Sequence, residues 1–345
     1  MRPVLSFFFV SVWLAGGSSA AGSPLEEATA AVRAKDYPRA SSLLLPLAHG
    51  GNPEAQFQLG LLLSHRKEVL EADHPQARLW YLKAARRGHI KAQFYLAWML
   101  EDGQGGPKDP AEAAQWYLKA AERGHCWSQF GLGRLYAEGR GVDKGLAQAR
   151  EWVRRSADGG YDYAKFYLGY LLAHHPDARP PDYTGALRWY RLAADRGIAD
   201  AHYTLGIMRY KGQGMPKDLG RAVERFRKGA ETDHPPSQHA LGECYARGHG
   251  VPKDAATARD WHKKAADNGW PEAARALGAT AIHYPQPVQV IEAGPRPDVS
   301  DAGIRIGIVA RDDPAQAWGV ARERFPEDRK GQLLHQLAMK VSDSA

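Results

Sequence analysis

The sequence contains very little cysteine: Cys126 and Cys244 are the only two among 345 residues. They are 118 positions apart, which is about three units of the repeat described below. Such a separation places them far beyond the distance that a disulfide can span. The chain therefore has no disulfide framework, and neither cysteine lies in a pattern typical of a catalytic nucleophile.

The sequence also lacks a block of like charge, although its formal net charge is +7. Lys and Arg are spread along the whole chain. This distribution predicts a generally basic surface and not a dedicated nucleic-acid site. We therefore expect no nucleic-acid partner.

Signatures of catalysis are missing as well. The sequence has no H-E-x-x-H, no G-x-S-x-G and no paired-carboxylate motif, so nothing argues for hydrolysis. His174, His175 and Asp177 form the one local cluster of metal-ligand types, and they lack the i, i+4 spacing of a helical zinc pair. We expect no catalytic residue, no metal and no cofactor, and a protein that is not an enzyme.

A long hydrophobic run is absent too. The N-terminal run Val4–Ala15 is too short for a comfortable membrane span. It follows Arg2 and precedes small residues at Ser18 and Ala20, which is the pattern of a signal peptide over residues 1–20, cleaved after Ala20 or Ala21. We expect an exported, monomeric protein, periplasmic or secreted from a Gram-negative type of cell. An uncleaved anchor is the alternative.

The feature that is present in abundance is an internal repeat. A Leu-Gly pair recurs every 36 or 37 residues, with Ala97 as the one departure from glycine. The leucines are Leu59, Leu96, Leu132, Leu168, Leu205, Leu241 and Leu277. A period of this size predicts a repeat architecture, here an all-α, α/α superhelical solenoid of helix pairs.

The repeat divides the chain. We expect an N-terminal capping half-repeat at 24–51, with helical segments at Leu25–Ala34 and Ala40–Ala48, the second interrupted by Pro46. Six repeats then occupy 52–279, and a C-terminal capping helix at 270–279 closes them. The repeats fall at about 52–88, 89–124, 125–160, 161–197, 198–233 and 234–269.

Within each repeat the first helix carries the Leu-Gly pair, and the glycine after the Leu lets the neighbouring helix approach closely. The first helix ends at Gly103, Gly139, Gly212 or Gly248. Asp109, Asp218 and Asp254 are expected N-caps of the second helix. That helix carries an aromatic residue (Trp80, Trp116, Trp152, Trp189, Phe226 or Trp261) and ends at Gly88, Gly124, Gly159 or Gly197.

Three motifs of these repeats, A-x-x-x-L-G-x-x-Y, G-x-G-V-x-K-D and W-x-x-K-A-A-x-x-G-H, resemble the Sel1-like repeat family, which is related to the tetratricopeptide repeats. The resemblance covers Asn52–Ala279. It implies a right-handed superhelix of antiparallel helix pairs that acts as an adaptor or scaffold. The paired cysteines of some secreted members are absent, so a disulfide-stapled variant is not implied.

The repeat stops after Thr280. Residues 280–302 contain Pro285, Pro287, Pro295 and Pro297 and are predicted to be a linker. Residues 303–345 resemble a fragment of the luciferase-like, flavin-dependent monooxygenases through IVARDDPAQAW, AxERF and HQLAMKVSDS. Its single predicted strand, Ile304–Ala310, cannot close a barrel or build a flavin site, so we expect a poorly ordered remnant.

A candidate binding surface follows from helix geometry. Residues two before and two after each repeat Leu point about 160° and 200° away from it, toward the concave side of the solenoid. The earlier column gives Phe94, Phe130, Phe166 and Tyr203, and the later column gives Trp98, Arg134, Tyr170 and Ile207. The alternative for the earlier column, which we favour, is packing between successive helices. Trp98 and Tyr170, with Arg134 between them, are predicted to be exposed at the groove centre.

These observations predict an exported, non-enzymatic scaffold that binds a protein or peptide in its concave groove. Two alternatives stay open. The repeats could tether a flavin-dependent oxidoreductase activity linked to the tail, or the basic convex face could bind the cell envelope through peptidoglycan or anionic lipid.

Overall fold

The structure, a computed structural model, describes residues 23–64, 73–175 and 180–278. All regular structure in these ranges is α-helical, with fifteen helices and no strand, which confirms the all-α prediction. The predicted signal peptide (1–20), linker (280–302) and tail (303–345) lie outside the described residues, as does Asp177.

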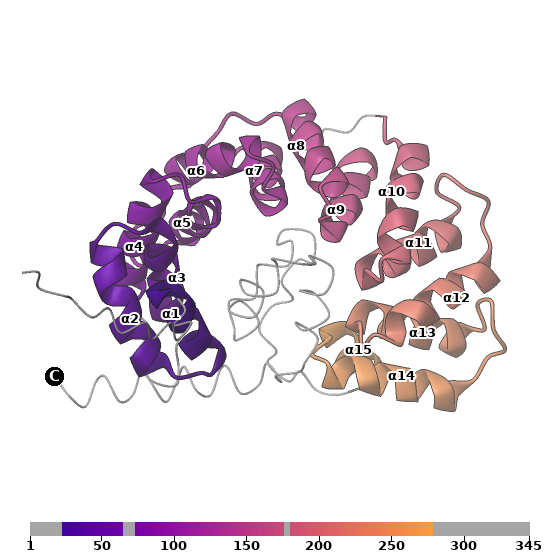
Figure 1. Cartoon of the computed structure of the whole chain (residues 1–345). Coiled ribbons are helices and arrows are strands. Elements are labelled where there is room, and N and C mark those ends of the chain that lie inside the picture. The colour runs from indigo at the N-terminus through magenta and orange to yellow at the C-terminus, as the bar shows by residue number, and fades with distance from the viewer. Residues whose placement is uncertain (1–22, 65–72, 176–179, 279–345) are drawn as a thin grey trace, which may run out of the picture.

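The helices form a curved arc in which alternate helices lie on the inner and outer sides (Figure 1). The inner helices of the repeats are α3 (Pro53–Ser64), α5 (Ile90–Asp102), α7 (Cys126–Glu138), α9 (Asp162–Ala173), α11 (Ala199–Lys211) and α13 (Pro235–Arg247). The outer helices are α4 (His74–Arg86), α6 (Pro110–Glu122), α8 (Leu146–Asp158), α10 (Tyr183–Asp195), α12 (Leu219–Ala230) and α14 (Ala255–Asp267). The pair α1 (Pro24–Arg33) and α2 (Tyr37–His49) precedes them, and α15 (Pro271–Ala276) follows. The Leu-Gly helices therefore line the concave side, as predicted.

Packing in the arc is local. The extensive helix–helix contacts join helices that are consecutive in the sequence, and α11 also touches α13. Each repeat thus buries its apolar side chains against its two neighbours, which is the defining property of a solenoid.

The glycine after the repeat Leu allows the inner and outer helix of one repeat to meet. A Cβ placed on Gly60 or Gly169 would lie 2.7 Å from a ring carbon of Tyr81 or Tyr190, respectively. The predicted close approach is confirmed. Phe226 occupies this same ring position against Gly206, so its assignment to the tryptophan series is wrong: the residue equivalent to those tryptophans is Arg225.

Two glycines define four of the six inner-to-outer turns; the turns after α3 and α9 contain none. Gly103, Gly139, Gly212 and Gly248 are left-handed C-caps with φ between 69° and 76°, which confirms their predicted role. The glycine two residues later packs on the start of the preceding outer helix. A Cβ at Gly141 would lie 2.2 Å from the carbonyl carbon of Pro110, so this glycine sets the spacing between two repeats.

Five of the six outer helices of the repeats begin at an aspartate cap, and α8 begins at Gly145 without a side-chain cap. The Asp109, Asp218 and Asp254 carboxylates accept from backbone N–H groups of the first helical turn at 2.8 to 3.1 Å, as predicted. Asp36, Asp73 and Asp182 cap α2, α4 and α10 in the same way.

The predicted interruption at Pro46 is wrong, whereas the predicted end of α8 at Gly159 is confirmed. Helix α2 continues through Pro46, because a proline in the last turn removes only one intrahelical hydrogen bond. After α8 the left-handed glycine is Gly160, with φ of 95°, while Gly159 keeps a helix-like φ of −74°. The spacing from Gly124 is therefore 36 residues, as elsewhere in the array.

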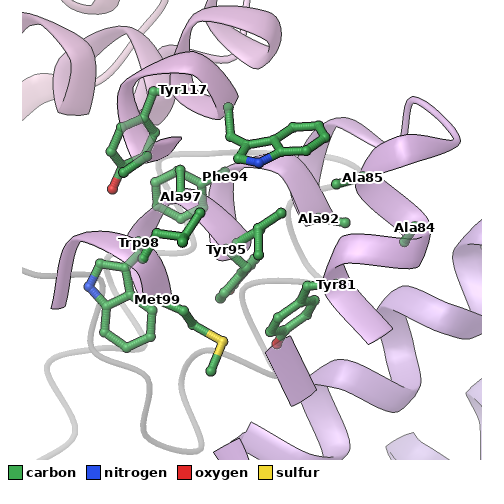
Figure 2. Packing of buried hydrophobic residues seen from close by; sticks show 14 of the residues in the cluster. Tyr81, Ala84, Ala85, Ala92, Phe94, Tyr95, Ala97, Trp98, Met99 and Tyr117 are labelled. Carbon is green, nitrogen blue, oxygen red and sulfur yellow. The ribbon is translucent and has the colours of Figure 1, made fainter. Parts of the chain in front are cut away.

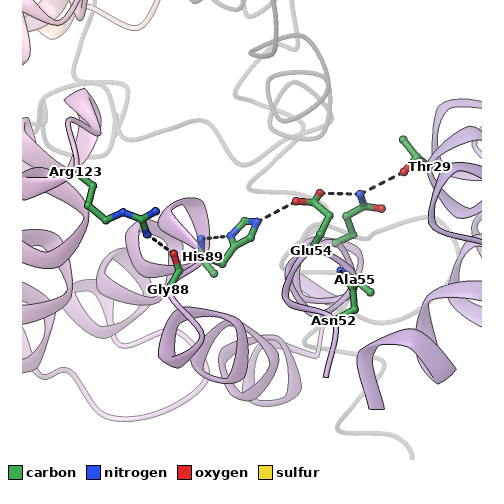
Figure 3. A network of polar contacts seen from close by, with 9 residues as sticks. Thr29, Asn52, Glu54, Ala55, Gly88, His89 and Arg123 are labelled. Atoms are coloured by element: carbon green, nitrogen blue, oxygen red, sulfur yellow. Dashed lines mark hydrogen bonds and ion pairs between the residues drawn. The ribbon is translucent and has the colours of Figure 1, made fainter. Parts of the chain in front are cut away.

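A polar joint connects successive inner helices (Figure 3). His89 caps α5 by accepting from the Ala92 N–H at 3.1 Å, and its Nε2 lies 3.0 Å from the Glu54 carboxylate of the previous repeat. Its ring stacks on Phe57 at 4.5 Å between centroids. His234 keeps the acidic partner and the ring contact, with Asp200 at 3.3 Å and the Tyr203 ring edge-on at 5.9 Å, but its Nδ1 lies 2.8 Å from the Ser237 hydroxyl and does not cap the backbone.

His125 caps α7 by accepting from the Ser128 N–H at 3.3 Å. Its joint has a basic neighbour, Lys91, in place of the acid. Burial, and next the positive charge of Lys91, lower the pKa of His125 to about 4. The folded state therefore favours neutral His125. Its contribution to stability is full above the pKa of an unfolded histidine, about 6.5, and is lost as the pH falls from there toward 4.

We expect His125→Asn to remove this acid sensitivity while keeping the cap, because Asn52 caps α3 at the equivalent position and accepts from the Ala55 N–H at 3.0 Å. The wild type should lose up to about 3 kcal/mol more than the variant between pH 7.5 and 4.5, measured by urea unfolding. Both proteins share every other titrating group, so an equal loss in both would contradict this role of His125.

Candidate partner-binding surface on the inner face

The earlier column of predicted groove residues is mostly buried. Phe94, Phe130 and Phe166 are 4%, 7% and 5% exposed. Phe94 packs against Tyr117 of the adjacent outer helix and against His125 and Trp127 of the next repeat, at 5.2 to 6.0 Å between ring centroids. Phe130 likewise contacts Tyr161 and Tyr167 of the next repeat. Phe166, by contrast, packs on Tyr163 and Tyr190 of its own repeat. The three rings therefore serve in packing, and their assignment to an accessible surface is wrong.

Trp98 is also buried, at 6% exposure, so the prediction that it is exposed at the groove centre is wrong. It belongs to a core cluster with Phe94, Tyr95 and Met99 (Figure 2). Helix α5 is buried over ten consecutive residues, from Ala92 to Glu101. A helix that is apolar on most of its faces is typically buried on most of them, and helical angle alone does not reveal this.

Arg134 is held by a carboxylate that the sequence reading did not single out. Its guanidinium donates to Glu101 of α5, which is 3% exposed. Arg140 also reaches Glu101 at 3.1 Å, and the Tyr117 hydroxyl donates to it at 3.1 Å. Burial, and then the charge of Glu101, raise the pKa of Tyr117 well above its ordinary value. Arg134 is thus part of this buried network. It is also accessible from the surface, because 15% of its side chain is exposed.

Tyr170, Tyr203 and Ile207 are intermediate in exposure. Tyr170 lies on α9 and stacks between Tyr167 and His174, with centroids 5.7 and 6.2 Å away. Tyr203 and Ile207 are one turn apart on α11 and pack on the cluster that contains Phe226. The accessible part of the predicted surface is therefore Arg134, Tyr170, Tyr203 and Ile207, on three consecutive inner helices.

A glutamine that recurs on the inner helices was not predicted to have a role. Gln56, Gln93, Gln129 and Gln238, three residues before the repeat Leu, donate to a carbonyl at the end of the preceding outer helix, at 2.9 to 3.4 Å. Each of these carbonyls also accepts from a backbone N–H three residues later, just beyond the helix, so the glutamine is a second donor that ties the next repeat to it. The signal was present in the sequence, because glutamine recurs at one repeat position in four of the six units.

The described residues contain no group of three or more His, Cys, Asp or Glu side chains arranged to hold a metal ion. His175 is buried with its Nε2 at 3.2 Å from the Ala137 carbonyl oxygen, and His174 stacks on Tyr170. Both cysteines are free, as predicted. None of the described helices combines the length and the apolar character that crossing a bilayer requires.

The family model described as "Sel1 repeat" matches the chain six times. The matches cover residues 53–89, 90–125, 128–161, 162–198, 199–234 and 235–270, which is more than half of the sequence. A search of curated proteins gives no match.

Solved structures give the same architecture. A Sel1 repeat protein from Oxalobacter formigenes is 30% identical, with a TM-score of 0.64 over 71% of this chain and 97% of that one. A protective antigen present in uropathogenic Escherichia coli strains, described as displaying an SLR fold, is 30% identical, with a TM-score of 0.61 over 69% of this chain. The match spans 50% of the length of the antigen structure.

Proposed function

This chain belongs to the Sel1 repeat family, and from that premise we propose that it is a non-enzymatic scaffold that binds a protein or peptide on the inner face of its arc. The family membership supports an interaction role in general. The inner face of α7, α9 and α11 is the part of the chain to which we assign the contact.

The observation that carries this assignment is the change in exposure along one column of the inner helices. Leu61 and Trp98, on α3 and α5, are buried at 7% and 6% exposure. The equivalent residues Arg134, Tyr170 and Ile207 are partly exposed on three neighbouring helices. They place a guanidinium, a phenol ring and an aliphatic side chain in a row along the concave side, and arginine and tyrosine are among the residues most enriched at binding hot spots.

The row fits an extended segment of a partner better than a globular face. Arg134, Tyr170 and Ile207 lie on successive inner helices, so an extended chain that crosses these helices would meet the three side chains in turn. We therefore propose a peptide segment with an apolar or aromatic anchor over Tyr170 and Ile207 and an acceptor near Arg134.

We further propose that the scaffold works outside the cytoplasm, after removal of the N-terminal segment. The support is the sequence pattern of residues 1–20. This part of the proposal and the inner-face assignment can be tested on one sample.

The test is cross-linking of tagged protein in cells, followed by osmotic release and recovery of the complex. We expect a partner with the wild type, and at least a roughly tenfold lower yield with Tyr170→Ala/Ile207→Ala, because truncation of one hot spot costs over 1 kcal/mol. The intact mass of the released chain should correspond to a mature protein whose first residue is Ala21 or Gly22.

Leu45→Ala/Leu79→Ala is the matched control. It also truncates two large apolar residues, which are 43% and 50% exposed and lie on α2 and α4. It should retain the partner. If both variants lose the partner equally, or both retain it, the assignment to the inner face is wrong. If the chain is uncleaved and found in the cytoplasmic fraction, the export proposal is wrong.

A further inference from the structure

The outer helices repeat a surface pattern of their own. A tryptophan is followed three residues later by a lysine or arginine, and the cation lies over the indole ring. The pairs are Trp80 with Lys83, Trp116 with Lys119, Trp152 with Arg155 and Trp261 with Lys264, at 3.9, 4.1, 4.8 and 4.3 Å from cation to ring centroid. Four of the six outer helices thus cover an aromatic ring with a charge.

The two exceptions are neighbours in the stack. On α10, Trp189 is followed by Leu192, which is 40% exposed where the other repeats have a cation. On α12, Arg225 occupies the tryptophan position and is followed by Lys228. The exceptions place an apolar side chain at the surface of one helix and an additional cation on the next.

Four cations of α10 and α12 have no carboxylate partner among the described residues. On α8, Arg154 and Arg155 are both paired with Glu151, at 2.6 and 2.9 Å. Across the described ranges, by contrast, no ion pair or side-chain hydrogen bond forms at Arg188, Arg191, Arg225 or Lys228. Burial, followed by the charges of Arg225 and Lys228, lowers the pKa of the nearby His202, in agreement with a positive local potential.

A shallow hollow lies on the surface of α10, beside Leu192. Leu187 and Leu192 line it together with Arg188, Arg191 and Thr184 of α10, and Gly214 of the next turn closes one side. The hollow therefore combines apolar side chains with two guanidinium groups.

Charge is also divided between the two sides of the arc. The six outer helices of the repeats contain 16 Lys and Arg against 8 Asp and Glu, whereas the six inner helices contain 6 against 7. Because the outer helices form the convex side of the arc (Figure 1), the net positive charge of the repeat helices is on that side.

We propose that the outer face of α10 and α12 docks on an anionic lipid bilayer. Arg188, Arg191, Arg225 and Lys228 bind headgroup phosphates, and Leu192 enters the boundary between headgroups and acyl chains. Cations beside an exposed apolar residue match the chemistry of that boundary, where phosphate lies directly above hydrocarbon. A convex arc touches a flat surface through a few adjacent outer helices, and this contact leaves the inner face open.

Vesicle co-sedimentation with purified protein tests the proposal. We expect binding to phosphatidylcholine vesicles that contain roughly one third phosphatidylglycerol, none to pure phosphatidylcholine, and a decrease at high salt. Each Lys or Arg near such a surface is worth about fivefold in partitioning, so Arg188→Gln/Arg191→Gln should weaken binding roughly 25-fold. Leu192→Gln should weaken it severalfold with no change in charge.

Lys83→Gln/Lys119→Gln is the control. It removes the same charge from the outer face but at least two repeats away, beyond a Debye length of about 8 Å, and should change binding by less than about twofold. Absence of binding to the anionic vesicles, or equal weakening by the control, would overturn the proposal. So would binding of a DNA duplex as tight as that of the vesicles together with no effect of Leu192→Gln, since the patch would then be a general polyanion site.

Discussion

Gly141→Ala is expected to destabilise the array by about 2–5 kcal/mol, although the position is on the surface. The residue has φ of +71°, where an L-residue pays about 1–2 kcal/mol. Its new Cβ would also lie 2.2 Å from the carbonyl carbon of Pro110, and relief of such overpacking costs about a further 1–3 kcal/mol. Urea unfolding followed by circular dichroism measures the loss.

Gly124→Ala separates the two causes. Gly124 has a similar φ of +83° but nothing within 4 Å of the position of a Cβ, so its variant should lose only about 1–2 kcal/mol. The difference between the two variants reports the contact between the turn and the preceding outer helix. Equal losses would mean that the contact contributes nothing.

Glu101→Ala is the second substitution with a large expected effect. It leaves Arg134, with 15% of its side chain exposed, without its carboxylate, and it takes the acceptor from the Tyr117 hydroxyl. Loss of one partner from a buried ion pair typically costs about 3–5 kcal/mol. Thermal and urea unfolding should both show a loss of this order.

Two further variants make the measurement specific. Glu138→Ala removes the more exposed partner of Arg140, at 3.0 Å, and should cost about 1 kcal/mol or less. Glu101→Leu/Arg134→Met replaces the pair by apolar residues and should recover most of the stability. If Glu101→Ala costs no more than Glu138→Ala, the network does not hold α5 to α7.

The repetition explains why much of the fold could be predicted from the sequence. Gly103 and Asp109 each have equivalents in other repeats, so their roles as C-cap and N-cap were supported several times over. The glycine after the repeat Leu was likewise predictable, because a small residue at a fixed position on a helix indicates close packing.

Departures from the repeat were harder to predict. The prediction put Phe226 in the tryptophan series, one position out of register. In most other repeats the tryptophan position and the next one are both aromatic, as in Trp80 and Tyr81, so the two positions are easily confused. His89 and His125 are N-caps, and a histidine at that position carries no strong propensity signal. Glu101 has Ser64 and Ala137 as its equivalents, so no periodic pattern marked it.

The inner surface was the least predictable part. Helix geometry placed Trp98 and Tyr170 on the same side of their helices, but exposure depends on everything that packs there. Trp98 lies on a helix buried over ten consecutive residues, while the corresponding row is partly exposed on α7, α9 and α11. A sequence gives the direction of a side chain far more directly than it gives the neighbours that cover it.

The joints between repeats have a consequence for how such a chain can change length. Every element of a joint, including the His89 cap, the Glu54 carboxylate and the Gln93 donor, comes from two adjacent units. These contacts involve no residue of a more distant repeat, so they do not depend on the number of units. Duplication or excision of one 36-residue unit would therefore join compatible ends, and the copy number of the array can vary in evolution without redesign of a central core.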